Sequence, residues 1–382
     1  MRIALVLGTS TGGIGAHVHD LAAGLTERGH AVTVAGPGQT EEHFGFAKAG
    51  ASFRPVPISA AVNPARDFNA FRALRAALSD ADVVHAHGVR AGALTGLALT
   101  RRHIPSVVTL HNAMLASGTK ARLLTGLEKL AVSRADVVLG ASGDLVERAR
   151  ALGARDARHG PVPAPPLPPA SRDRAQVRAE LGIKDAPGDY LNDHQILVLA
   201  IGRLAPQKDY ATLLRAVRAW QDAWQTQPGT PGPPPRLAIA GGGPLQRALQ
   251  AEIDAQGLNV LLLGHRADVA DLLAAADLLA LSSSWEARAL AVQEAMRAGV
   301  PVVATAVGGT PGLAGDAAVL VPPADPQALA HAVVRLARDP AERARLAALG
   351  RERARTWPDA AQCLDRLTEI YTGFYAGIYP GL

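Results

Sequence analysis

The sequence predicts two α/β domains, each built around a parallel, doubly wound β-sheet. Its 382 residues suit two domains of ordinary size. Short apolar runs alternate with segments of helical periodicity in two successive series, which is typical of repeated β-α units. A proline-dense segment separates the two series. Hydrophobic residues make up 48% of the chain but aromatic residues only 4%, and this aliphatic bias favours helix-covered parallel sheets over a β-sandwich.

The first series begins at the N-terminus and predicts an N-terminal domain over residues 1–160. Residues 3–7 form an apolar run that predicts a buried strand. Val18, Leu21 and Leu25 then keep helical spacing, and Gly29 is a suitable helix end. Further strands are predicted at residues 31–35, 83–85, 107–110 and 137–139.

The chain then enters a predicted linker and connecting segment over residues 161–194. Proline at this density forbids helix and central strand and favours an extended, stiff connector. The six prolines are Pro161, Pro163, Pro165, Pro166, Pro168 and Pro169.

The second series predicts a C-terminal, ligand-binding domain over residues 195–356. Residues 227–235 contain further prolines and predict a surface loop, and a final helix is expected at about 360–375. We expect the segment 357–382 to pack back on the N-terminal domain, and a ligand to bind in a cleft between the domains. Strands are predicted at residues 196–201, 237–240, 260–263, 278–281, 302–304 and 319–321.

Charge and cysteine content exclude some classes of protein. The net charge of +5 comes from an excess of arginine, with only five lysines, and indicates either an ordinary solvated surface or attraction to polyanions and anionic membranes. No nucleic-acid partner is expected. A single cysteine, Cys363, supports neither a disulfide framework nor a cysteine-based metal site. No apolar stretch reaches the roughly 18 residues that span a bilayer and no signal peptide is evident, so we expect a cytoplasmic protein.

A glycine-rich loop follows the first predicted strand. Gly8, Gly12, Gly13 and Gly15 precede a helix whose N–H groups could face a diphosphate or an acceptor, although a tight strand-to-helix turn explains them as well. The loop also resembles the cofactor turn of short-chain dehydrogenases. Its glycine spacing is one residue too long for that family, and no lysine has a tyrosine four residues before it.

Two cations follow the strand predicted at 196–201. Arg203 and Lys208 lie where doubly wound sheets bind ligands, and Asp209 is a suitable N-cap for the next helix. The guanidinium fork and the ammonium group can offset the charge of a departing diphosphate. The alternative is a pair of solvated surface cations.

Two glutamates follow the strand predicted at 278–281. Glu286 lies in the loop after the strand, and Glu294 lies about one turn into the following helix, which ends at Gly299. Carboxylates accept paired hydroxyl hydrogen bonds from a sugar diol, while helix N–H groups between them can face phosphate oxygens. The alternative is two surface glutamates.

The motifs together resemble glycosyltransferase family four. They occur in that family's order and span residues 12–309. The resemblance implies a GT-B fold, in which two Rossmann-like domains face a cleft, and a retaining, metal-independent transfer from a nucleotide sugar. The motifs are GGIGAHV, HAHG, TLHN, GRLAPQKDY, IAGGGPL, the E-x7-E segment and AGVPVVATAVGG.

The resemblance also implies roles for individual residues. Arg203 and Lys208 match the pair that grips the donor pyrophosphate, Glu286 the residue that holds the transferred sugar, and Glu294 the residue that binds the ribose. His111 matches the histidine beside the reacting sugar, so His111, Arg203, Lys208 and Glu286 form the expected catalytic set. The donor-binding set is completed by Gly13, Gly15, Gly243, Arg266, Ala289 and Leu290.

Other features leave alternatives open. His85 and His87 alternate on one strand face, and we expect a structural role for them. The string Asp80-Ala-Asp82 matches the D-x-D motif of metal-dependent transferases but precedes its strand, so no metal site is expected. Ala287-Arg288-Ala289 and Pro311-Gly312 depart from the family pattern, and Arg288 could contact a phosphate, a charged acceptor or solvent.

We therefore expect a retaining hexosyltransferase of the cell envelope or of small-molecule metabolism, with no cofactor. Uridine diphosphate sugars are the first candidate donors and guanosine diphosphate sugars the second, and the acceptor could be a glycolipid, an envelope glycan or a small metabolite. The alternatives are a relative with other nucleotide-sugar chemistry, such as an epimerase, and a non-catalytic nucleotide-sugar binding protein. A basic amphipathic segment at 120–134 predicts either a core helix or contact with the inner face of a membrane.

Overall fold

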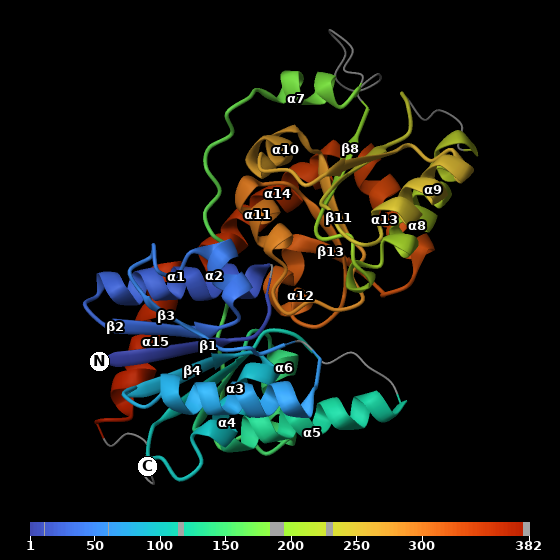
Figure 1. Cartoon of the computed structure of the whole chain (residues 1–382). Coiled ribbons are helices and arrows are strands. Elements are labelled where there is room, and N and C mark those ends of the chain that lie inside the picture. Colours follow the sequence, from blue (N-terminus) through green and yellow to red (C-terminus); the bar gives the residue numbers. More distant parts are fainter. Residues whose placement is uncertain (11, 60, 114–117, 184–194, 227–231, 377–382) are drawn as a thin grey trace. The chain divides into compact units, whose positions relative to one another are not determined.

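The computed structural model describes residues 1–10, 12–59, 61–113, 118–183, 195–226 and 232–376 (Figure 1). The predicted fold class is confirmed, since both halves contain a parallel sheet covered by helices. The chain divides into two compact units, one formed by Met1–Val162 with Pro358–Leu382 and the other by Pro163–Trp357. The proline-dense segment and the helix after it thus belong mostly to the second unit. Part of the predicted 227–235 loop lies outside the described residues.

The first unit contains a seven-stranded parallel sheet in the order β3-β2-β1-β4-β5-β6-β7. The register places Ile3 opposite both Val32 and Val83, and Val84 opposite Ser106. The strands are β1 (Arg2–Leu7), β2 (Ala31–Gly36), β3 (Ser52–Pro55), β4 (Val83–His87), β5 (Ser106–Leu110), β6 (Val137–Gly140) and β7 (Ala157–His159).

The two faces of this sheet are covered by different helices (Figure 1). On one face, Ile3, Leu5 and Leu7 pack with Val18 of α1 (Gly13–Glu27) and with Leu367 of α15 (Ala360–Gly373), so the C-terminal helix completes the N-terminal core. On the other face α4 (Val89–Ala98) contacts β4 and β5 and lies between α3 (Pro64–Ala77) and α5 (Gly118–Arg134). The remaining helices are α2 (Gly38–Phe44) and α6 (Gly143–Ala151).

The second unit contains a six-stranded parallel sheet in the order β10-β9-β8-β11-β12-β13. Its strands alternate strictly between two cores: Val198 and Ala200 belong to one, and Leu197 and Leu199 to the other. The strands are β8 (Leu197–Ile201), β9 (Arg236–Ala240), β10 (Val260–Gly264), β11 (Leu278–Leu281), β12 (Val302–Thr305) and β13 (Ala318–Val321).

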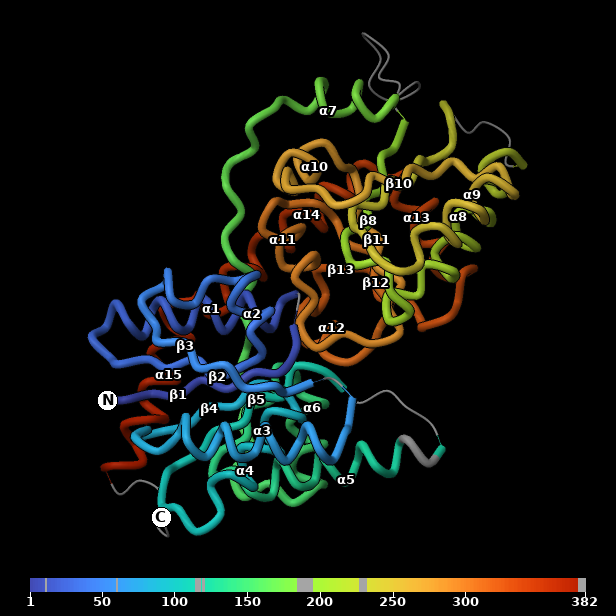
Figure 2. Tube along the Cα trace, viewed as in Figure 1, coloured from blue at the N-terminus to red at the C-terminus, as the bar shows by residue number. Residues whose placement is uncertain are grey.

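Helices cover both faces of the second sheet, as the tube in Figure 2 also shows. The first core contains residues of α8 (Tyr210–Thr226), α9 (Gln246–Gln256) and α13 (Pro326–Arg338). The second core contains residues of α7 (Arg174–Glu180), α10 (Val269–Ala275), α11 (Leu290–Ala298) and α12 (Thr310–Ala314). α14 (Pro340–Arg355) packs on α11, and two 3-10 turns span Pro206–Lys208 and Gly315–Ala317.

The strand order of each sheet defines where a ligand can bind. In both sheets the order reverses between two neighbouring strands, β1 and β4 in the first unit and β8 and β11 in the second. The loops that leave the carboxyl ends of such a pair run to opposite faces and open a crevice. Within the described ranges, no helix is long and apolar enough to cross a membrane.

Candidate functional site

The centre of the candidate site is an ion pair between the loops that follow β8 and β11. Lys208 Nζ donates to Glu286 Oε1 at 2.5 Å, and the Ser283 hydroxyl donates to the same oxygen at 2.7 Å. The Lys208 side chain is 19% exposed and that of Glu286 is 9% exposed. The two residues are 78 positions apart, and they meet because β8 and β11 are neighbours at the reversal of strand order. A cation and a carboxylate are thus held together at the position where this fold binds ligands.

Further hydrogen bonds fix these two loops to each other. Gln207 Nε2 donates to the carbonyl of Trp285 at 2.8 Å, and the backbone N–H of Ser284 donates to the carbonyl of Gln207 at 2.8 Å. The Ser282 hydroxyl donates to the carbonyl of Lys208 at 2.8 Å. Such bonds hold the charged groups in place before any ligand arrives, which lowers the cost of ordering them on binding. Sequence reasoning did not single out Gln207 or these serines.

The start of α8 orients the lysine loop. The predicted capping role of Asp209 is confirmed, since its carboxylate accepts from the backbone N–H of Thr212 at 3.3 Å and from the Thr212 hydroxyl at 2.7 Å. The hydroxyl of Tyr210 donates to the carbonyl of Gly202 at 3.0 Å. Burial, with a smaller effect from the nearby Glu286 carboxylate, raises the pKa of the Tyr210 phenol. Tyr210 is therefore a neutral anchor for the loop.

Glycines allow the loop after β9 to lie directly against the loop after β8. A Cβ on Gly241 would lie 1.9 Å from the carbonyl oxygen of Gly202, and a Cβ on Gly243 would lie 2.5 Å from that of Leu204. Both glycines also have positive φ, 157° and 159°. The contact is sealed by the Leu204 N–H, which donates to the Gly242 carbonyl at 2.9 Å. Gly243, predicted as a donor-binding residue, thus shapes the backbone next to Arg203.

Gly308 likewise allows the loop after β12 to lie close to the backbone of Glu286. The N–H of Gly309 donates to the carbonyl of Glu286 at 2.8 Å, and a Cβ on Gly308 would lie 2.1 Å from that same oxygen. The glycine pair of the AGVPVVATAVGG motif therefore supports the backbone of Glu286, a role that the motif alone did not reveal.

The other predicted residues that follow β8 and β11 lie in the same two connections. Arg203 is exposed, and among the described residues its guanidinium forms no hydrogen bond or ion pair, while its backbone carbonyl accepts from the N–H of Ala205 at 2.8 Å. Ala289 precedes α11 and Leu290 is its first residue, and no side chain caps this helix start. The N-terminal N–H groups of α11 therefore lack a side-chain partner and can face an anion.

Glu294 lies on α11 and is partly buried. Burial raises the pKa of its carboxyl, and the nearby Arg297 guanidinium opposes that shift. Glu294 and Arg297 also line a cavity of about 350 Å³. The other lining residues are all apolar and come from the proline-dense segment, α10 and the end of α11: Pro165, Pro166, Leu167, Pro168, Ala170, Ala270, Leu273, Ala274 and Ala298.

Arg266, predicted as a donor-binding residue, is bonded to two acidic side chains. Its guanidinium binds Asp268, with contacts at 2.7 and 2.6 Å, and reaches Glu180 at 3.3 Å. The hydrogen bonds to Asp268 are the main cause of the raised pKa of Arg266. Arg288, for which several contacts were possible, has its guanidinium 5.4 Å from the ring centre of Trp357, in a cation–π arrangement.

In the first unit, the glycine-rich loop leads into α1. Gly12 is the N-cap of this helix, Gly13 opens it, and both are exposed. Gly15 is buried, and a Cβ on it would lie 2.1 Å from the Phe44 ring, so this glycine is required by packing against α2. The Ser10 hydroxyl accepts from the N–H of Gly15 at 3.1 Å.

His111 lies in a cluster of four histidines. His87 Nδ1 is 3.1 Å from His111 Nε2, and the His85 and His87 rings stack with centres 4.2 Å apart. His17 of α1 contacts the rings of both His87 and His111 edge-on, at 5.7 and 5.5 Å. The expected same-face placement of His85 and His87 is confirmed. The sequence did not predict that His17 and His87 contact His111.

The cluster is held neutral. His85 is fixed by Tyr371 of α15, whose hydroxyl lies 2.6 Å from Nδ1, and by the Thr109 hydroxyl, 2.7 Å from Nε2. Burial lowers the pKa of His17 to about 4 and that of His85 to about 3. Burial, reinforced by the neighbouring imidazoles, also holds the pKa values of His87 and His111 well below the usual range.

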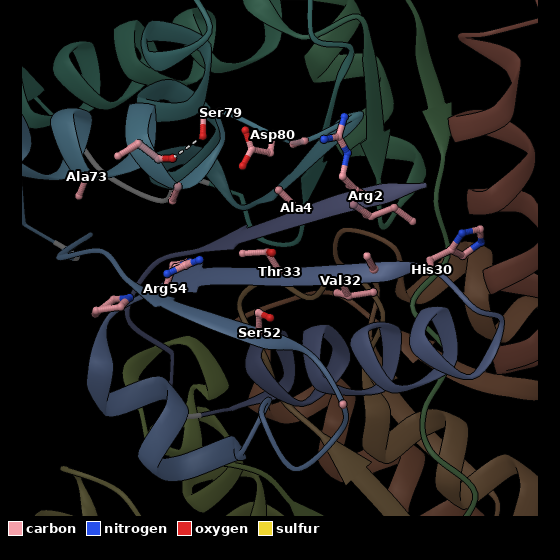
Figure 3. Close-up of a pocket in the computed structure, with 17 residues that line it drawn as sticks. Arg2, Ala4, His30, Val32, Thr33, Ser52, Arg54, Ala73, Ser79 and Asp80 are labelled. Carbon is pink, nitrogen blue, oxygen red and sulfur yellow. Dashed lines mark hydrogen bonds between the residues drawn. The ribbon is translucent and has the colours of Figure 1, made fainter.

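A larger cavity of about 790 Å³ lies elsewhere in the first unit, over β1, β2 and β3 and beside α3 (Figure 3). Short side chains such as Ala4, Thr33 and Ser52 leave it hollow, and Arg54 and Asp80 are among its polar lining. No predicted site residue lines it.

The Asp80-Ala-Asp82 string lies before β4 and is bonded to β1. Asp82 precedes β4 and accepts from the N–H and guanidinium of Arg2, at 2.7 and 2.6 Å. These hydrogen bonds lower the pKa of the Asp82 carboxyl. The string thus lies at the amino end of β4, away from the carboxyl ends that carry the histidines. Within the ranges that the structure describes, no group of three or more His, Cys, Asp or Glu is arranged around a metal position.

Two family models match the chain. Residues 12–165 match the glycosyl transferase 4-like domain, and residues 185–353 match glycosyl transferases group 1. The chain is 30% identical over 314 residues to a D-inositol 3-phosphate glycosyltransferase of Xylanimonas cellulosilytica, covering 74% of this chain and 70% of that protein. It is 31% identical over 319 residues to the protein of the same name from Saccharomonospora viridis, covering 76% and 69%.

Solved structures share the fold. Anabaena Alr3699/HepE in complex with UDP superposes with a TM-score of 0.77 and 20% identity, over 98% of this chain and all of that one. Sucrose-phosphate synthase from Thermosynechococcus elongatus gives a TM-score of 0.76 and 22% identity, over 98% and 99%. This likeness confirms the predicted GT-B fold class.

Proposed function

Because the chain belongs to the group 1 glycosyltransferases of family four, we propose that it is a retaining, metal-independent enzyme that transfers a hexosyl group from a nucleoside diphosphate sugar. The contact between Lys208 and Glu286 carries this proposal. It supplies, at one position, a cation for the leaving diphosphate and a carboxylate for the hydroxyls of the sugar.

The residues around that contact support a division of roles. Lys208 and the exposed Arg203 offset the negative charge that grows on the diphosphate as the glycosidic bond breaks. Glu286, fixed by Ser283, accepts hydroxyl hydrogen bonds from the transferred sugar. The free N–H groups at the start of α11 add a partial positive charge near the phosphates. Glu294, further along α11, binds the ribose diol.

Retention and metal independence rest on the family resemblance and on the placement of acidic groups. In the retaining reaction of such enzymes the leaving phosphate accepts the acceptor's proton on the same face of the sugar. The Glu286 carboxylate is bonded to Lys208 in the free protein. We therefore assign it to binding the sugar hydroxyls and not to nucleophilic attack. The D-x-D string, with Asp82 bonded to Arg2, lies at the opposite end of its strand from the histidine cluster.

Uridine diphosphate sugars are the first candidate donors and guanosine diphosphate sugars the second, and the enzyme uses no cofactor. The solved complexes of Anabaena HepE with UDP and UDP-glucose support this order. The acceptor belongs to the glycolipids, envelope glycans or small metabolites. Inositol phosphates should be tested among the acceptors, because two similar proteins are D-inositol 3-phosphate glycosyltransferases.

The α5 helix supports a second proposal, peripheral contact with the inner face of a membrane. Leu123 is 54% exposed, and Arg122 and Lys129 on the same helix are also exposed. Basic and apolar groups side by side favour an anionic bilayer surface. Co-flotation with anionic liposomes that is lost in Leu123→Asp supports this contact. Equal flotation with neutral and anionic liposomes contradicts it, and so does a complete absence of flotation.

The main test is release of nucleoside diphosphate across a panel of nucleotide sugars in excess EDTA. Turnover of one donor, accelerated by an acceptor and retaining the anomeric configuration, supports the proposal. Acceptor-independent conversion of the sugar nucleotide would indicate epimerase-type chemistry. Binding without turnover at any acceptor would indicate a non-catalytic binding protein.

A further inference from the structure

The contact between His87 and His111 constrains where the proton of each ring lies. Nδ1 of His87 and Nε2 of His111 are 3.1 Å apart, so one of them carries a proton and donates it to the other. His87 is 2% exposed and His111 is 8% exposed. Both rings are neutral at physiological pH because burial disfavours their charged forms. Each ring therefore has a single N–H.

The second nitrogen of His87 decides between the two arrangements. His87 Nε2 is buried and has no hydrogen-bond partner among the described residues. If His111 were the donor, the proton of His87 would lie on this Nε2, as a buried N–H without an acceptor. A buried N–H without an acceptor is rarer and costs more free energy than a buried ring nitrogen whose lone pair has no donor. The favoured arrangement has the proton of His87 on Nδ1.

We infer that His87 is a positioning residue that donates from Nδ1 to His111 Nε2 and so holds His111 in its Nδ1–H form. This inference rests on the proposed function, in which His111 lies beside the reacting sugar. In this form His111 is a neutral hydrogen-bond donor to an oxygen of the substrate. Its Nε2 lone pair is occupied, so His111 does not remove a proton from the acceptor.

The surrounding rings hold this arrangement. The His85 ring stacks on His87 and is itself fixed at both nitrogens, by Tyr371 and Thr109. The His17 ring lies in T-shaped contact with the rings of His87 and His111. A 180° turn of the His87 ring about χ2 would put Cδ2 in the place of Nδ1 and lose the bond to His111, so this bond favours the observed ring orientation.

The direct test is long-range ¹H–¹⁵N spectroscopy of the full chain labelled at histidine, because ring-nitrogen shifts distinguish Nδ1–H from Nε2–H. We expect His87 and His111 both as Nδ1–H, unchanged as the pH is lowered from neutral to mildly acidic values. His111 observed as Nε2–H, or as a cation, overturns the inference whatever the activity. Nδ1–H histidines in a protein that turns over no donor overturn the proposed function and leave the tautomer assignment standing.

Two isomer-matched substitutions test the functional consequence. The amide of His87→Asn can replace Nδ1–H, whereas the amide of His87→Gln matches the position of Nε2. His87→Asn should keep donor hydrolysis within about threefold of wild type and keep His111 as Nδ1–H. His87→Gln should lower kcat about tenfold or more with little change in KM, the size expected for loss of one oriented hydrogen bond. Equal losses in both variants, with wild-type melting temperatures, contradict the positioning role.

Discussion

Lys208 Nζ and Glu286 Oε1 lie 2.5 Å apart at the reversal of strand order in the second unit, although 78 residues separate them in the chain. The Ser283 hydroxyl shares the same carboxylate oxygen. The contact links two loops that leave neighbouring parallel strands, so it depends on the fold and couples the cation proposed to bind the diphosphate to the carboxylate proposed to bind the sugar. A nucleotide sugar that binds here must either replace the Lys208–Glu286 contact or add its own contacts to the two side chains.

Removal of Lys208 should therefore affect both catalysis and stability. Lys208→Met is expected to lower kcat by about 10²–10³, as for loss of one group that stabilises developing charge. It also leaves Glu286 buried with one partner fewer, which should cost about 1–3 kcal/mol of the free energy of unfolding. Adding Glu286→Gln should restore much of that stability without restoring turnover. Urea unfolding and donor hydrolysis on the single and double variants check this, and a stable, active Lys208→Met protein contradicts it.

Glycine substitutions beside Arg203 test the backbone cradle. Gly243→Ala places a Cβ 2.5 Å from the Leu204 carbonyl oxygen at a positive φ, so we expect strain of about 1–3 kcal/mol and weaker nucleotide binding. Gly242→Ala is the matched control, since no atom lies within 4 Å of its Cβ position. Thermal unfolding and calorimetric titration with UDP measure both effects. Equal behaviour of the two variants would show that the close approach of these loops is unimportant.

Glu294 should show opposite effects on stability and binding. Its pKa is raised by burial, so the folded protein disfavours the carboxylate, and stability declines as the pH rises through the raised value. Glu294→Gln removes this penalty and should raise the melting temperature at neutral pH while weakening nucleotide binding. In the wild-type protein, nucleotide affinity should fall at acid pH as Glu294 becomes protonated. In Glu294→Gln this pH dependence of affinity should be absent. A lower melting temperature in Glu294→Gln would contradict this assignment.

The neutral histidine cluster predicts acid sensitivity of the first unit. The pKa of His85 is lowered to about 3, whereas an unfolded histidine titrates near 6.5, so the unfolded chain binds more protons between these values. Stability therefore falls as the pH falls through this window. His85→Gln, whose amide can still form a hydrogen bond with the Thr109 hydroxyl, should reduce the pH slope of unfolding by about 1.4 kcal/mol per pH unit. Urea unfolding at a series of pH values measures the slope, and an unchanged slope would place the acid sensitivity elsewhere.

Much of the fold was predictable because buried parallel strands are short apolar runs. Most predicted strands agree with the structure to within two residues at each end. β3 and β7 were missed. β3, Ser52–Pro55, is a mostly exposed edge strand that ends in proline, and β7 has only three residues with arginine and histidine among them. Neither contains the apolar run on which the prediction depends.

The candidate site was predictable at the level of loops but not of contacts. Position after a strand identified Lys208 and Glu286, and strand adjacency then brought them together. Arg266 was chosen on resemblance, whereas its contacts with Asp268 and Glu180 depend on how α7 and α10 pack. The His87–His111 bond joins the end of β4 to the residue that follows β5, and no spacing within the chain indicates which ring nitrogens face each other.

The most direct test of the central claim is calorimetric titration of the protein with UDP and GDP in EDTA, with Lys208→Ala and Glu294→Ala alongside. The account predicts that one nucleotide binds the wild-type protein, and that each variant binds it at least about tenfold more weakly, a loss of roughly 1.4 kcal/mol or more. Equal binding in wild type and both variants, or no binding of any nucleoside diphosphate, would contradict a donor site at the ends of β8 and β11.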